Sequence, residues 1–166
     1  MDRRLRHMPC RIVQQLLISN GQGTDPEDDD LWPIYYDNLP DSPNSAIRVL
    51  DTDGTGNRLH LGPYIEKQGV QILVRSEGTE GYHNKTTYIA KILDEVHREE
   101  IALEVIDSST GSVVSEVTYR VNAVHRDPTI RRLGREREGG QRFMWSLNAI
   151  VDIEIIAVVP QTGTGS

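Results

Sequence analysis

The chain has 166 residues, of which 37% are hydrophobic and 26% are charged, and these proportions are ordinary for a soluble globular protein. Its formal net charge of -7 at pH 7 argues against a dedicated nucleic-acid binder, which needs a broad basic surface. The single cysteine, Cys10, excludes an internal disulfide, and no apolar run is long enough for a transmembrane helix or a signal peptide. We expect one domain that stays in a reducing cytoplasm or in an assembly built there.

The N-terminal part of the chain predicts a basic extension, a helix and a loop rich in carboxylates. Residues 1–8 are basic, and we expect them to be frayed. Pro9 suits the first turn of a helix, and the helix should end near Asn20. Its apolar stripe consists of Ile12, Val13, Leu16 and Leu17. The acidic loop that follows (residues 21–30) holds five carboxylates, and such charge runs are most often solvated.

The middle of the chain predicts short strands around a second helix. Three segments are rich in β-prone residues: Leu31–Leu39, Ala46–Leu50 and Val70–Arg75. An apolar stripe at helical spacing predicts a helix over Asn84–Glu100, and an extended segment should follow over Ile101–Ile106. Between the strands, residues 51–57 match the first positions of a calcium loop. The match fails at the twelfth position, where Gly62 replaces the bidentate glutamate, so we expect a β-turn there.

The most regular pattern lies near the C-terminus and consists of two alternating runs. In the second run the apolar positions are Phe143, Trp145, Leu147, Ala149, Val151, Ile153 and Ile155, which is typical of a half-buried strand. The first run contains Val117, Tyr119, Val121 and Ala123 and ends before Asp127 and Pro128. We expect these two runs to form the central antiparallel pair, joined by a long connection.

The order of helix, strands, helix and strands favours the α+β class. We expect a mostly antiparallel β-sheet with two α-helices packed on one face and a long central hairpin near the C-terminus. The expected organisation is a basic extension over residues 1–8, a single α+β domain over residues 9–159 and a flexible polar tail over residues 160–166.

The sequence contains none of the common signatures of catalysis or phosphate binding. It has no glycine-rich phosphate loop, no G-x-S-x-G, no H-E-x-x-H and no C-x-x-C. Its five histidines lack the spacing of metal ligands, and Cys10 has no evident base beside it. We therefore predict no catalytic residue, no metal ligand and no cofactor.

One basic cluster lies in the connection between the two long runs. It comprises Arg131, Arg132, Arg135, Arg137 and Arg142. Arginine is enriched at protein interfaces and pairs bidentately with carboxylates, so we expect an arm that reaches another subunit and is poorly ordered in the free monomer. The complement expected on that subunit is the acidic loop, through Asp28, Asp29 and Asp30.

Three other roles are open for these charged segments. The arginine connection is a solvated hairpin tip if it has no partner. It is instead a nucleic-acid contact if binding to DNA depends steeply on salt. The acidic loops, at residues 25–30 or at Asp51 and Asp53, are alternatively the carboxylates of a metal-dependent hydrolase or nuclease.

Three blocks of the sequence resemble the phage tail terminator proteins, which are also termed tail completion or minor capsid proteins. The blocks are PCRIVQQLLISNGQGT with LWPIYYDNLPDSPNSAIRVLDTDGT, then GVQILVRS with TTYIAKILDEV, and finally RDPTIRRLGREREGGQRFMWSLN. Together they cover about residues 9–152, in the same order and at similar spacing.

The resemblance implies a structural virion protein, not an enzyme, that is assembled in the host cytoplasm. It implies a homo-oligomer, a hexameric ring, at the head-proximal end of the phage tail. Such a ring stops growth of the tail tube and provides the surface for head–tail joining. The implied partners are the tail tube protein and the head–tail connector protein, with DNA passing through the ring without specific binding.

Overall fold

The structure is a computed structural model, and it describes residues 5–28, 32–52, 66–77, 79–135 and 142–161. The two helices are α1 (Pro9–Ser19) and α2 (Thr79–Glu95). The strands are β1 (Ile34–Tyr36), β2 (Ala46–Asp51), β3 (Glu66–Glu77), β4 (Glu99–Ile106), β5 (Val113–Arg126), β6 (Arg131–Arg135) and β7 (Arg142–Pro160). Within these residues, no helix is long and apolar enough to cross a membrane.

The strands form one curled sheet in which β7 is central. The order is β1-β2-β3-β7-β5-β4, and β6 pairs with β7 beyond the point where β5 leaves it. Only β1 and β2 are parallel; the other described pairs are antiparallel. The expected central pair, β5 with β7, is therefore confirmed, as is the α+β class.

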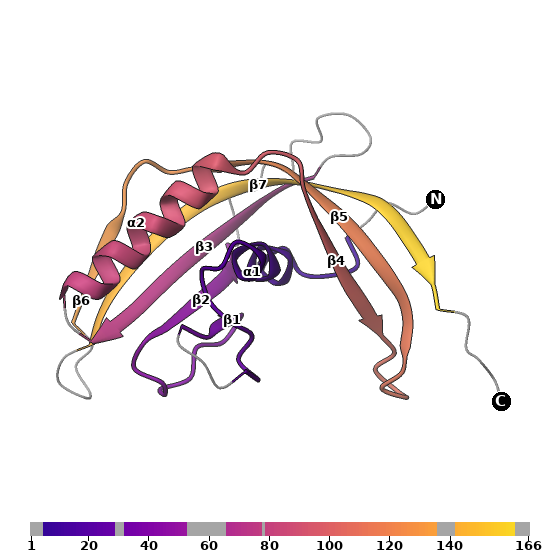
Figure 1. Cartoon of the computed structure of the whole chain (residues 1–166), viewed down its shortest axis with the longest axis horizontal. Helices are drawn as coiled ribbons and strands as arrows, with labels where there is room; N and C mark the ends of the chain where they lie inside the picture. The colour runs from indigo at the N-terminus through magenta and orange to yellow at the C-terminus, as the bar shows by residue number, and fades with distance from the viewer. Residues whose placement is uncertain (1–4, 29–31, 53–65, 78, 136–141, 162–166) are drawn as a thin grey trace.

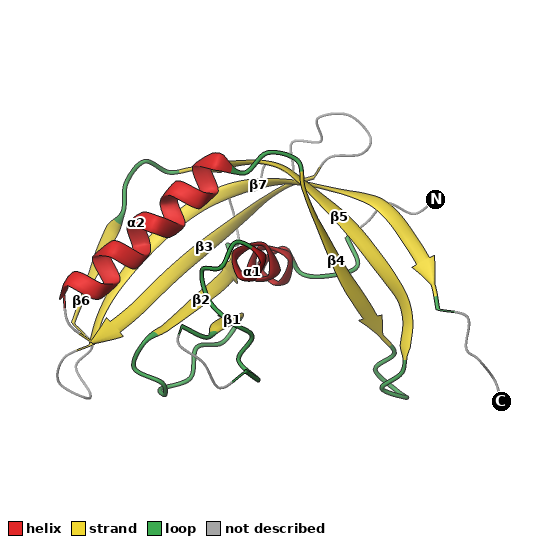
Figure 2. Cartoon of the chain, viewed as in Figure 1, coloured by secondary structure: helices red, strands yellow, loops and turns green. Residues whose placement is uncertain are grey.

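Alternate residues of the long strands supply one continuous core. Ile72 of β3 lies opposite Leu147 of β7, and Val121 of β5 lies opposite Ile153. These side chains are buried in the same cluster as the apolar stripes of both helices, which include Leu16, Leu17, Ile89 and Leu93. Both helices thus cover one face of the sheet, here termed the core face, with α1 under the arch of strands and α2 along β3 and β7 (Figures 1 and 2). The opposite side is termed the open face.

The N-terminus of α1 is capped by a residue from a distant strand. Met8 provides no side-chain cap, and the backbone N–H of Cys10 donates to Oδ1 of Asp51, the last residue of β2, at 2.7 Å. A carboxylate at this position satisfies a free helical N–H and interacts favourably with the helix dipole. Asp51 therefore has a structural role, while the calcium-like turn from Asp53 onward, including Gly62, lies outside the described residues.

Cys10 itself is fully buried, and the structure predicts that its thiol is inert. Burial, reinforced by the nearby Asp51 carboxylate, raises the pKa of the thiol from 9.0 to about 12. Because the thiolate is the reactive form, we expect a thiol reagent at pH 8 to label Cys10 only after unfolding. Rapid labelling of the native protein in stopped-flow absorbance would contradict this burial. The raised pKa also means that any stability from the neutral thiol is present below pH 9 and is lost as pH rises toward 12.

The second helix differs from the expected Asn84–Glu100 at both ends. It begins at Thr79 and ends at Glu95, and Glu99 already starts β4. After α2, the backbone turns at Arg98, whose φ of 52° is left-handed and incompatible with a continuing helix. The Arg98 N–H donates to the Asn122 carbonyl of β5. The predicted helix was therefore too long at its C-terminus. Val96, which lies after the helix, is buried and continues the helical spacing by chance.

The chain before α1 is attached to the sheet and is not frayed over residues 5–8. The Tyr119 hydroxyl accepts the backbone N–H groups of Arg6 and His7, both at 3.1 Å, and lies 2.7 Å from His7 Nδ1. Burial raises the pKa of Tyr119, so its O–H is available as the donor to Nδ1. When the Tyr119 O–H donates to Nδ1, the N–H at Nε2 of His7 donates to the Glu104 carbonyl, which lies 2.9 Å away.

Two further expectations about the C-terminal part need correction. Pro160 belongs to β7, opposite Ser115, so the flexible tail does not begin there; residues 162–166 lie outside the described residues. The arginine connection was expected to be a poorly ordered arm, whereas its first part, Arg131–Arg135, forms β6 on the edge of β7; residues 136–141 lie outside the described residues. Its alternation is interrupted by a bulge between Arg132 and Gly134, which is why the sequence showed no strand pattern.

Candidate subunit interface

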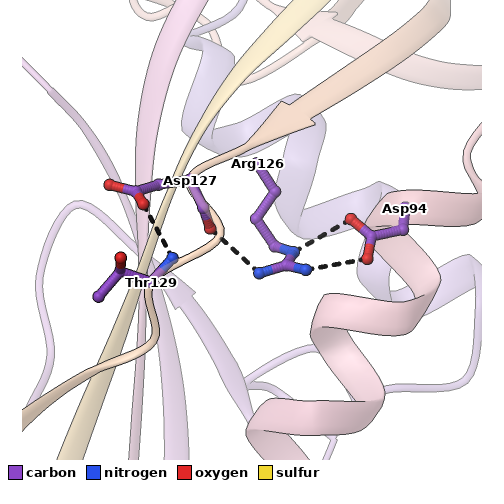
Figure 3. A network of polar contacts seen from close by, with 4 residues as sticks. All are labelled: Asp94, Arg126, Asp127 and Thr129. Atoms are coloured by element: carbon purple, nitrogen blue, oxygen red, sulfur yellow. Dashed lines mark hydrogen bonds and ion pairs between the residues drawn. The ribbon is translucent and has the colours of Figure 1, made fainter.

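The segment leading into β6 is held by an arginine that connects β5 to α2. The Arg126 guanidinium donates two hydrogen bonds of 3.0 Å to the Asp94 carboxylate and a third to the Asp127 carbonyl (Figure 3). The hydrogen bond with Asp94 raises the pKa of Arg126, which stays charged. Asp127 Oδ1 accepts the N–H of Thr129 at 2.9 Å. This paired geometry fixes the direction in which the chain enters β6.

The first part of the predicted basic cluster is presented on the edge of the sheet. Arg131 and Arg132 are exposed, and Leu133 at the bulge is 48% exposed. Arg132 lies over the ring of Phe143, with 5.6 Å between the guanidinium carbon and the ring centroid. Gly134 has a φ of 91°, which only glycine adopts without strain, and this bulge turns Leu133 outward. The basic segment, defined as Arg131, Arg132 and Leu133, is therefore a positioned surface.

Of the other predicted arginines, the structure describes the side chain of Arg142 alone. Arg135 ends β6, and nothing is described of its side chain, while Arg137 lies outside the described residues. Arg142 begins β7, and its guanidinium donates to the Asp41 carbonyl of its own chain. Arg142 is thus used within the fold.

The acidic loop is only partly described. Asp28 is exposed and its N–H donates to the Asp25 carbonyl, whereas Asp29 and Asp30 lie outside the described residues. Within the described residues no ion pair joins Asp28 to Arg131 or Arg132 of the same chain. If Asp28 pairs with Arg131 or Arg132, those arginines belong to another copy of the chain.

A hollow of about 280 Å³ lies between α1 and the acidic loop. Arg11, Gln14, Asp25, Glu27, Tyr35 and Tyr36 line it. Arg11 donates to the Gln14 side chain and lies over the Tyr36 ring, 5.1 Å from its centroid. The Gln14 amide in turn donates to the Ile34 carbonyl, so these polar groups hold α1 against β1. Among the described residues, no three His, Cys, Asp or Glu side chains are grouped as a metal site requires.

The open face carries rows of charge that the sequence analysis did not identify. In one row across three strands, Arg120 of β5 lies between Glu100 of β4 and Glu154 of β7, at 3.1 and 3.3 Å. The hydrogen bond with Glu100 raises the pKa of Arg120. Elsewhere on this face, Asp152 Oδ2 lies 3.2 Å from His125 Nε2, and Asp152 Oδ1 lies 3.8 Å from Lys67 Nζ. The alternating charges in β4 and β5 were visible in the sequence, but the register that pairs them was not.

In a comparison with known protein families, the family model described as bacteriophage tail terminator protein matches residues 16–155 of the chain. The matched range runs from the C-terminal half of α1 to the C-terminal half of β7. A search of curated proteins finds none that matches the chain.

Proposed function

The chain belongs to the bacteriophage tail terminator family, and from this premise we propose that it forms a ring at the head-proximal end of the tail tube. The ring ends growth of the tube and presents the surface to which the head joins. The observation that carries the proposal is the family match over residues 16–155, because it covers the whole of the sheet core.

A ring of identical subunits needs two different patches that meet head to tail and close. The basic segment suits one side of such a contact, because its charge is opposite to the net charge of the molecule. We propose Arg131 and Arg132, with Arg135 and Arg137 following them in the chain, for this side. Asp28, Asp29 and Asp30 of the acidic loop are the complement that the sequence suggests.

The ring we propose is hexameric, and its two sides contact the tail tube protein and the head–tail connector protein. A subunit with a net charge of -7 repels DNA that passes through the bore, which favours passage over binding. The protein acts here as a structural component of the virion and performs no catalysis.

Loss of the chain is expected to give tails of unregulated length that do not join heads. We would place a stop codon in the phage gene, supply variants in trans and measure tail length by electron microscopy. The wild-type chain should restore fixed-length tails, and the triple variant Arg131→Glu, Arg132→Glu, Arg135→Glu should not, because repulsion replaces attraction at each contact. Normal tails without any copy of the chain would refute the proposed function.

The matched control is Lys91→Glu, which reverses an exposed positive charge on α2 and leaves β6 unchanged. It should restore tails as well as the wild type does. The triple variant should also keep its circular dichroism spectrum and unfolding midpoint, since exposed charges contribute little to folding. DNA binding by the wild type that falls steeply with salt, and is lost in Arg131→Ala with Arg132→Ala, would instead favour a nucleic-acid module.

A further inference from the structure

At one end of the sheet, the open face of β4, β5 and β7 has no covering element among the described residues. Both helices lie on the core face, where Leu103 and Val117 are buried. On the open face, Ile106 is 59% exposed, Val159 is 56% exposed and Val114 is 43% exposed. Exposed apolar residues gathered at one end of a sheet are typical of a surface that a partner covers.

The charges beside these apolar residues are of one sign. Glu104 of β4 lies directly opposite Glu116 of β5, and Glu116 lies opposite Val159 of β7. Like charges directly opposite on neighbouring strands repel and destabilise the sheet. Within the described residues neither carboxylate forms an ion pair. We term Glu104, Glu116, Ile106, Val114 and Val159 the acidic end patch.

Elsewhere on the open face, the carboxylates of neighbouring strands are paired with an arginine. Four positions back along β4, Arg120 bridges Glu100 and Glu154 across the same three strands. The row between them is neutral, with Thr118 opposite both Ala102 and Ala157. A guanidinium placed over Glu104 and Glu116 would do what Arg120 does for the other row. The acidic end patch therefore lacks an arginine that its own chain does not supply in the described residues.

The basic segment is the complementary surface, and it lies at the other end of the molecule. Figure 1 shows β6 at one end of the longest axis and the tips of β4, β5 and β7 at the other. Arg131 and Arg132 form no ion pair within the described residues, and Leu133 adds an exposed apolar side chain beside them. The basic segment thus combines an exposed apolar side chain with positive charge, and the acidic end patch combines exposed apolar side chains with negative charge.

We infer that the acidic end patch binds the basic segment of a second copy of this chain. Arg131 or Arg132 of that copy pairs with Glu104 and Glu116, and its Leu133 packs against Ile106 and Val159. Because the two patches differ and lie at opposite ends, the contact is heterologous and repeats from copy to copy, as a closed ring requires. This inference rests on the proposed ring and names its contact surface, in place of the acidic loop.

Charge exchange tests the contact directly. Sedimentation of the full chain should show that Glu104→Arg with Glu116→Arg, or Arg131→Glu with Arg132→Glu, weakens self-association by about 100-fold or more. The chain with all four changes should return to within about 10-fold of the wild type, because opposite charges face one another again. Glu95→Arg, an exposed reversal on α2, is the matched control and should change nothing.

The acidic loop is the competing complement, and the same assay distinguishes it. Rescue of Arg131→Glu with Arg132→Glu by Asp28→Arg, but not by Glu104→Arg with Glu116→Arg, would overturn the inference and assign the contact to the acidic loop. Unchanged self-association of both reversed variants would also overturn it.

Cross-linking gives a second readout that does not depend on measured affinity. A chain carrying Glu116→Cys, mixed with one carrying Leu133→Cys and oxidised, should give a covalent dimer that neither chain gives alone. Cys10 contributes no background because it is buried. Rings without this cross-link would refute the named surface and leave the proposed function intact. If the wild-type chain stays monomeric in solution at high concentration and forms no ring on tails, both the named contact surface and the proposed function are refuted.

Discussion

Replacing Leu147 with alanine is expected to lower the free energy of unfolding by about 2–5 kcal/mol. Leu147 is 0% exposed and lies in the N-terminal half of β7, the strand that joins both halves of the sheet. Its neighbour across the ladder is Ile72 of β3, so truncation leaves a cavity between strands that cannot close without moving the sheet. The expected loss is a large share of the stability of a domain this size.

The measurement is urea unfolding followed by tryptophan fluorescence, at one fixed protein concentration because self-association stabilises the folded state. Ile150→Ala is the control: Ile150 lies in the same strand, points to the open face and is 39% exposed. Its truncation should cost clearly less than that of Leu147. A loss below about 0.5 kcal/mol for Leu147→Ala would mean that the assigned faces of β7 are reversed.

Gly23→Ala is expected to cost about 1–3 kcal/mol, or more if the loop cannot move. A Cβ at Gly23 would meet the Trp32 carbonyl oxygen and would lie 2.6 Å from Ile34 Cγ1. The Thr24 N–H donates to the Trp32 carbonyl, and the Ile34 N–H donates to the Thr24 carbonyl. The backbone on both sides of Gly23's contact is therefore already fixed by hydrogen bonds. The alanine therefore has to separate the acidic loop from β1.

Thermal unfolding should show the loss, and Gly111→Ala provides the comparison. Gly111 has a φ of 70° with open space around its Cβ position, so alanine there costs only the left-handed strain of about 1 kcal/mol. Gly23→Ala should also perturb the Trp32 fluorescence, whereas Gly111→Ala should not. Equal effects of the two substitutions would show that the close approach at Gly23 relaxes freely.

The periodic segments were predictable from the sequence because their signals are local. Alternation in β7 and the apolar stripe of α1 record which side of each element is buried, whatever it packs against. The central pair, the α+β class and the packing of both helices on one face of the sheet followed from these patterns. The family resemblance, confirmed by the match over residues 16–155, came from the order of such blocks.

Only the tertiary structure decided which distant groups meet. The cap of α1 comes from Asp51, 41 residues after Cys10, and the anchor of the N-terminal segment comes from Tyr119. The strand β6 exists because β7 extends past β5 and offers it a free edge, although its own sequence has no alternation. Neither local propensity nor periodicity contains this information.

The candidate interface shows the same division between sequence and structure. The sequence identified Arg131 and Arg132 by composition alone, and the structure places them on an exposed edge. The sequence did not identify Glu104 and Glu116, the carboxylates that we assign to these arginines, because they occupy ordinary polar positions of two strands. Only the register of β4 with β5 places Glu104 opposite Glu116. The same register places Arg120 opposite Glu100. Register is fixed by turns, bulges and packing over the whole sheet, so it is a property of the folded chain and not of any one segment.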